Sequence, residues 1–111
     1  MNWILLNSDQ QIEEIIRASD NQPQVIFKHS TRCSISTMAK GRLERAGLPG
    51  HVPFYYLDLL NHRPISKKIA EMFSVEHESP QVLVIKNGKC VYTESHSGIH
   101  MDEILQKTSM N

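Results

Sequence analysis

The chain has 111 residues, of which 40% are hydrophobic and 22% charged, as expected for one soluble globular domain spanning residues 1–111. Its 12 basic and 12 acidic residues give a formal net charge of zero, which argues against a nucleic-acid-binding protein because such proteins carry a basic excess. We find neither a signal-peptide pattern nor the roughly 18 consecutive apolar residues of a membrane span, so we expect a cytoplasmic protein that does not bind membranes.

The N-terminal part of the chain predicts a short strand followed by a helix. Residues 3–6 are apolar, and Ser8 with Gln11 three residues later has the spacing of a capping box. Within residues 9–18 isoleucines repeat at helical spacing while charged residues occupy the opposite face. We therefore expect an amphipathic helix over residues 9–18.

A second strand and a second helix follow. Residues 24–28 contain a run of apolar strand-forming residues, which predicts a buried strand. From Ile35 onward the apolar residues follow helical spacing, through Met38, Ala39, Leu43 and Ala46, and we expect Met38 to fill the core. Gly47 is placed to end this helix.

The second half of the chain predicts a strand, a helix, a β-hairpin and a short closing helix. Residues 52–57 favour a strand, and Pro64 suits the first turn of the helix after it. Residues 81–86 and 89–94 read as two strands, and the Asn87-Gly88 dipeptide between them is typical of a type I′ hairpin turn.

The resulting order is β-α-β-α-β-α-β-β-α, which predicts an α/β fold with a central mixed sheet of four to five strands flanked by helices. The first half favours a parallel β-α-β unit, and the second half ends in an antiparallel hairpin. A cysteine where the helix after the central strand begins, and a proline just before the hairpin, are the arrangement of a thioredoxin-like fold.

Cys33 is the strongest candidate for a reactive group. Unpaired N–H groups and the positive end of the helix dipole would stabilise a thiolate at this position, and Arg32 adds a positive charge beside it. The alternative is a small, buried and unreactive cysteine. The loop-to-helix position and the polar neighbours favour the reactive interpretation.

Ser36 occupies the position of the second cysteine in a C-x-x-C redox motif. A site with a single thiol cannot resolve its own mixed disulfide and must pass the adduct to another thiol. Ser36 would hydrogen-bond the Cys33 sulfur or serve in helix initiation, and the two roles are compatible. Cys90 is interpreted as a packed residue of the hairpin, since a resolving role requires it within disulfide reach of Cys33.

Other residues are candidates for the surroundings of the thiol. Ser79-Pro80 precedes a strong strand, and the expected topology places this loop opposite the thiol, where the Ser79 backbone would pair with an incoming ligand. Thr31 is expected to contact substrate as well. His29 either influences the ionisation of Cys33 or is a partly exposed loop histidine. The histidines and cysteines have no metal-ligand spacing, so we expect no metal site.

Three blocks of sequence resemble a known family. They are K-H-S-T-R-C-S-I-S, then Y-Y-L-D-L with H-R-P-I-S, and then H-E-S-P-Q-V-L-V-I-K-N-G-K. In this order, and over nearly the whole chain, they closely resemble the YtxJ-like monothiol bacilliredoxins, which are small thioredoxin-like proteins of bacteria that use bacillithiol.

The resemblance implies a thiol–disulfide oxidoreductase that removes bacillithiol from S-bacillithiolated client proteins. Cys33 matches the family's nucleophile, and Ser79-Pro80 matches its proline loop. The resemblance implies no tightly bound cofactor; bacillithiol would be a co-substrate, and either a second bacillithiol or a disulfide reductase would regenerate Cys33. Bacillithiol is anionic, and we expect Arg32, Lys28 and the helix N-terminus to meet its charge. The alternatives are a redox sensor and a non-catalytic docking module.

Overall fold

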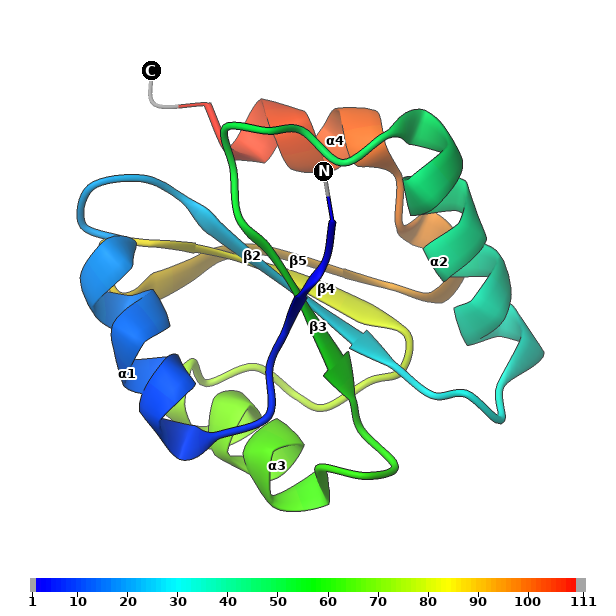
Figure 1. Ribbon diagram of the computed structural model, residues 1–111, viewed down its shortest axis with the longest axis horizontal. Helices are drawn as coiled ribbons and strands as arrows, with labels where there is room; N and C mark the ends of the chain where they lie inside the picture. The colour runs from blue at the N-terminus through cyan, green and yellow to red at the C-terminus, as the bar shows by residue number, and fades with distance from the viewer. Residues whose placement is uncertain (1, 110–111) are drawn as a thin grey trace.

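The computed structural model describes residues 2–109 as one five-stranded mixed sheet between two layers of helices (Figure 1). The strands are β1 (Ile4–Leu5), β2 (Gln24–His29), β3 (Phe54–Asp58), β4 (Gln81–Lys86) and β5 (Lys89–Ser95). The helices are α1 (Asp9–Ala18), α2 (Ser34–Ala46), α3 (Arg63–Met72) and α4 (Met101–Lys107), with a short 3-10 helix, η1 (His96–Gly98), before α4. The expected element order and the thioredoxin-like fold are confirmed, and η1 is an addition to them.

The order of strands in the sheet is β1-β3-β2-β4-β5. β3 pairs in parallel with both β1 and β2. The pairing is parallel because α1 and α2 carry the chain back along the sheet, so that each following strand runs in the same direction as the one before it. β4 pairs antiparallel with β2 and with β5. The central strand β2 therefore has a partner on each side, and the loop that carries Cys33 leaves from its C-terminal end.

Each face of the sheet is covered by two helices. α2 and α4 lie over one face, and α1 and α3 lie over the other (Figure 1). Side chains alternate along β2, so that Val25 and Phe27 pack in the first core while Ile26 packs in the second. Within residues 2–109 we find no helix that is both long enough and apolar enough to cross a membrane.

Local signals in the sequence set several element boundaries as expected. The side chain of Ser8 accepts a hydrogen bond from the Gln11 backbone and the Gln11 side chain accepts one from the Ser8 backbone, so the capping box at the start of α1 is confirmed. Gly47 ends α2 with a φ of 87°, a conformation that favours glycine. Asn87 and Gly88 have φ of 50° and 75°, as a type I′ turn requires.

The expected inward face of α2 is wrong at its first turns. The side chains of Ile35 and Met38 are 49% and 64% exposed, so neither fills the core. Ala39 and Leu43, which belong to the same apolar pattern, are buried as expected, and in the first turn Ser36 rather than Ile35 faces the sheet. Ser36 lies on the same helical repeat as Ala39 and Leu43, so a polar residue begins the inward face and the pattern of apolar residues did not reveal it.

Candidate functional site

Cys33 is the N-cap residue of α2 and is partly exposed to solvent. Its backbone N–H donates to the carbonyl of Ser30 at 3.2 Å, and its own carbonyl accepts from the Thr37 backbone N–H at 3.0 Å. No side chain caps the helix, and its first turn carries no acidic residue. The N-cap position is where a side chain lies nearest the free N–H groups of a helix, so the Cys33 thiol stands at the N-terminal end of α2.

Thr31 and Arg32 are both exposed in the loop that leads to Cys33. Within residues 2–109 the Arg32 side chain has no hydrogen bond and no ion pair. Its guanidinium is therefore free to meet an anionic ligand beside the thiol. The substrate contacts expected of these two residues remain predictions.

The Ser79-Pro80 peptide bond is cis, and Pro80 is buried. Because Lys28 pairs with Gln81, the antiparallel register places this loop beside the C-terminal end of β2, where the Cys33 loop begins. The Pro80 carbonyl accepts the His96 backbone N–H at 3.0 Å, which ties the loop to η1. Among the described residues no hydrogen bond uses the Ser79 backbone, and its buried hydroxyl has no partner, so Ser79 is available to a ligand.

Ser36 is fully buried, and the hydrogen bonds of its hydroxyl do not support a role beside the Cys33 thiol. Its Oγ lies 2.6 Å from Nδ1 of His29 and accepts the Ser30 backbone N–H at 3.0 Å. Among residues 2–109 these are the hydrogen bonds of the Ser36 side chain, and none of them joins it to Cys33. Ser36 therefore ties the start of α2 to the end of β2 and holds the loop between them.

His29 is a buried strand residue with 4% exposure, so the alternative of a partly exposed loop histidine is wrong. Its ring stacks on Phe27 and contacts Tyr56, with centroid distances of 5.9 Å and 5.5 Å. Burial lowers the pKa of His29, and the charge of Lys40 lowers it further, against an opposing effect of Asp58. The ring is thus kept neutral as an uncharged partner of Ser36.

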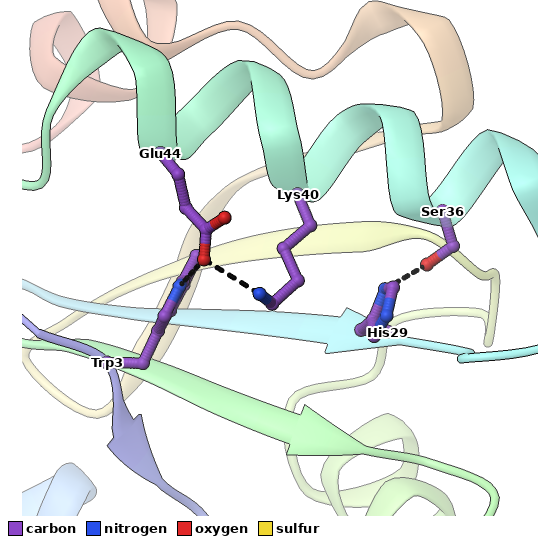
Figure 2. A network of polar contacts seen from close by, with 5 residues as sticks. All are labelled: Trp3, His29, Ser36, Lys40 and Glu44. Carbon is purple, nitrogen blue, oxygen red and sulfur yellow. Dashed lines mark hydrogen bonds and ion pairs between the residues drawn. The ribbon is translucent and has the colours of Figure 1, made fainter.

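The Ser36–His29 contact is one of several polar contacts that α2 makes toward the sheet, and the others involve residues that the sequence did not lead us to single out (Figure 2). Lys40 and Glu44 follow Ser36 at four-residue intervals on the face of the helix that lies over the sheet. Glu44 accepts hydrogen bonds from Lys40 at 2.7 Å and from Trp3 Nε1 at 2.8 Å, and these bonds lower the pKa of Glu44. The four-residue spacing was the available signal, but it does not reveal the partners on other elements.

We expect Ser36→Ala to destabilise the fold by about 1–3 kcal/mol, because it leaves the Ser30 N–H and the His29 ring without their buried partner. Urea unfolding at pH 7 measures the change. The matched control is Ser34→Ala, which alters an exposed serine of the same helix and should change the free energy of unfolding by under about 0.5 kcal/mol. Equal effects of the two substitutions would contradict the role of Ser36.

Cys90 lies at the far end of the sheet from Cys33. It is opposite Ile85 in β5, and Ile85 is opposite Gln24, the first residue of β2. The length of β2 alone, about 17 Å, separates that end from the Cys33 loop, whereas disulfide-linked Cα atoms are only about 4.4–6.8 Å apart. Cys90 packs against the second core, and burial raises the pKa of its thiol.

Lys28 does not face the thiol as expected. Its side chain is fully buried, and its Nζ donates to the carbonyl of Ser66 at 3.4 Å and to Nδ1 of His77 at 3.3 Å. Lys28 alternates with His29 along β2 and points into the opposite layer, toward α3. The prediction that Lys28 directly meets the charge of a thiol adduct at Cys33 is therefore wrong.

Within residues 2–109, no group of three or more His, Cys, Asp or Glu residues could hold a metal ion.

Comparison with solved structures agrees with this geometry. A protein of proposed oxidoreductase activity with a thioredoxin fold superposes with a TM-score of 0.78 at 32% identity, over 96% of this chain and 93% of that chain. Thioredoxin from Fasciola hepatica superposes with a TM-score of 0.75 at 19% identity, over 96% and 99% of the two chains. Thioredoxin from Trypanosoma brucei brucei gives 0.74 at 16% identity, over 96% and 87%. The last two likenesses show the fold.

The family model described as "Monothiol bacilliredoxin BrxC" matches residues 4–104, which include the Cys33 loop, the proline loop and both helical layers. Together with the thioredoxin fold, this match supports a thiol oxidoreductase. The chain belongs to the monothiol bacilliredoxin family.

Proposed function

We propose that this protein is a monothiol thiol–disulfide oxidoreductase that removes bacillithiol from S-bacillithiolated client proteins. The observation that carries the proposal is the isolation of one partly exposed thiol at a helix N-terminus. Ser36 is buried where a second thiol would stand, and Cys90 lies at the other end of the sheet. A thiol so placed can take up an adduct but needs an external thiol to release it.

The exchange has two steps. The Cys33 thiolate attacks the bacillithiol sulfur of a client mixed disulfide, a new disulfide forms between Cys33 and bacillithiol, and the client sulfur leaves as a thiolate that takes a proton. A second bacillithiol, as its thiolate, then attacks the bacillithiol sulfur on Cys33. This releases bacillithiol disulfide and restores the Cys33 thiolate, so that one disulfide is exchanged for another: the client sulfur is reduced to a thiol as the sulfur of the second bacillithiol is oxidised. A disulfide reductase is the other proposed route of recycling.

Two groups are free to hold the incoming disulfide. The Ser79 backbone makes no hydrogen bond within residues 2–109, and the loop lies beside the end of β2, so its amide and carbonyl can pair with an extended client segment. The Arg32 guanidinium is exposed next to the thiol and can meet the carboxylates of bacillithiol.

We expect Arg32→Ala to slow the formation of the bacillithiol adduct on Cys33 by about two- to fivefold at low salt, because a local positive charge raises the encounter rate of an anion. Stopped-flow exchange with oxidised bacillithiol, followed at two ionic strengths, measures the rate. Arg45→Ala removes an exposed arginine in the last turn of α2, away from the Cys33 loop, and serves as the control. The same rate loss in both variants would refute a local role of Arg32.

Mass spectrometry distinguishes this function from its alternatives. Reduced protein is mixed with oxidised bacillithiol, and the adduct is mapped by peptide analysis before and after a second thiol is added. The proposed enzyme forms an adduct on Cys33 that the thiol reverses, and it also removes the cap from a bacillithiolated client. A reversible adduct without loss of the client's cap would indicate a redox sensor, and an intact fold without an adduct would indicate a docking module.

A further inference from the structure

Lys28 is a buried cation that the thiol chemistry does not use. Its side chain has no exposure to solvent, and its hydrogen-bond partners are the Ser66 carbonyl and the His77 ring, both neutral acceptors. Within residues 2–109 no carboxylate lies within ion-pair distance of its ammonium group. An ammonium removed from water without an anion beside it is unfavourable, so an anion bound near Lys28 would be stabilised by its charge.

An open cavity of about 370 Å³ lies against the two partners of Lys28. It runs along one face of α3 and is lined by Leu59, Arg63, Ser66, Lys67, Ala70, Glu71 and His77. Ser66 and His77 both line the cavity and both contact the Lys28 ammonium, so the buried charge stands directly behind the cavity wall. The volume lies in the range of small-molecule sites.

The tautomer of His77 leaves a second N–H donor on a residue that lines this cavity. The Lys28 ammonium has only donors, so Nδ1 of His77 accepts from it and the ring proton of neutral His77 belongs on Nε2. Among the described residues Nε2 has no hydrogen-bond partner, and His77 is an exposed residue. An anion in the cavity would therefore find an N–H donor that is held in place from behind by Lys28.

The rim of the cavity carries an excess of positive charge. Arg63 and Lys67 are exposed, and within residues 2–109 their side chains form no hydrogen bond or ion pair, whereas Glu71 is the acidic residue of the lining. Burial lowers the pKa of His77, and the charges of Lys28 and Arg63 lower it further, against an opposing effect of Glu78. Both burial and the neighbouring positive charges therefore favour the neutral form of the His77 ring.

We propose that the cavity along α3 binds a small organic carboxylate, whose anionic end lies near His77 and Lys28 and whose apolar part rests against Leu59 and Ala70. The lining combines cationic side chains with the apolar Leu59 and Ala70, which favours an organic acid with an apolar part over inorganic phosphate. The proposal does not depend on the thiol chemistry of Cys33. The expected ligand is a free carboxylic acid, because Lys28 points toward α3 whereas Cys33 begins α2 on the other face of the sheet.

Benzoate, with benzamide as its neutral isostere, tests the site in titrations followed by amide NMR at constant ionic strength. We expect benzoate to shift the amide signals of Ser66, Ala70 and His77 in a saturable way, and benzamide to leave them unchanged. Lys67→Met should weaken benzoate binding about threefold, and Lys28→Met about tenfold. Lys68→Met is the matched control, because Lys68 is the next residue of α3 and does not line the cavity. Its Nζ forms an ion pair with Oδ2 of Asp9 at 3.7 Å instead.

Several results would overturn the proposal. These are the absence of a saturable shift, equal binding of benzamide, an equal loss in Lys67→Met and Lys68→Met, or binding of inorganic phosphate without binding of benzoate. If Lys28→Met fails to fold, the Lys67 and Lys68 pair still decides the outcome.

Protein that carries bacillithiol on Cys33 tests whether the ligand is a free acid. We expect benzoate to bind this protein with unchanged affinity; weaker binding, together with shifts of the same amide signals, would show that the attached bacillithiol occupies the cavity and would overturn the free acid as the ligand. Transfer from a bacillithiolated client is measured separately on the same samples. Loss of that transfer with intact benzoate binding would refute the proposed function alone, and the reverse pattern would refute the cavity alone.

Discussion

Cys33→Ser should lower the rate of bacillithiol transfer from a client protein by at least about 100-fold, to the rate at which the client loses bacillithiol without this protein. A serine hydroxyl is not ionised at neutral pH and cannot form the mixed disulfide, and no second thiol is near enough to replace it. The release of bacillithiol from a capped client, measured by intact-protein mass spectrometry over time, gives the rate.

Cys90→Ser is the matched control for that experiment, since it makes the same chemical change at the other cysteine of the chain. Cys90 is partly buried, donates from its Sγ to the Tyr92 carbonyl at 3.3 Å, and lies at the opposite end of β2 from the Cys33 loop. We expect Cys90→Ser to retain transfer within about twofold, with at most a small loss of stability. Loss of transfer in Cys90→Ser, or its retention in Cys33→Ser, would overturn the assignment of the nucleophile.

Lys28→Met should stabilise the protein at pH 7 by about 1–3 kcal/mol, because an apolar side chain of similar length removes a buried charge without an ionic partner. Burial lowers the pKa of Lys28 to about 8. The ordinary lysine value of 10.5 lies well above it, and that difference corresponds to a free-energy cost of about 3 kcal/mol for keeping the charged form folded. The lost contacts to Ser66 and His77 reduce the net gain.

The pH dependence of this effect has a definite sign. Between pH 8 and 10.5 the unfolded chain keeps the Lys28 proton that the folded protein has released, so the unfolded state binds more protons and stability rises with pH. The stability advantage of Lys28→Met over the parent is therefore greatest below pH 8 and shrinks as the pH rises toward 10.5.

Urea unfolding of both proteins between pH 7 and pH 9.5 measures this difference. Cys90 and Tyr92, whose pKa values are raised by burial, titrate in both proteins and cancel in the comparison. A constant gap between the two stability curves would contradict the perturbed Lys28, and a destabilised Lys28→Met at every pH would show that its polar contacts outweigh the cost of burial.

The boundaries of the elements were largely predictable, because they depend on contacts between residues close in the chain. Ser8 and Gln11 form their capping box within one helical turn, and the Asn87-Gly88 turn depends on the φ angles of two residues. The placement of Cys33 at the start of α2 is of the same kind, since it follows from where an apolar strand ends and a helix begins.

The sequence by itself thus determined the order of the elements, the thioredoxin-like fold and the position of the candidate nucleophile, since each of these follows from local patterns. The tertiary structure alone decided which side chains those elements bring together. Trp3 meets Glu44 across 41 positions of the chain, and Lys28 meets His77 across 49. Such contacts depend on the order of strands and on which face of β2 each helix covers, so no local pattern encodes the burial of Lys28 or the cavity in front of it.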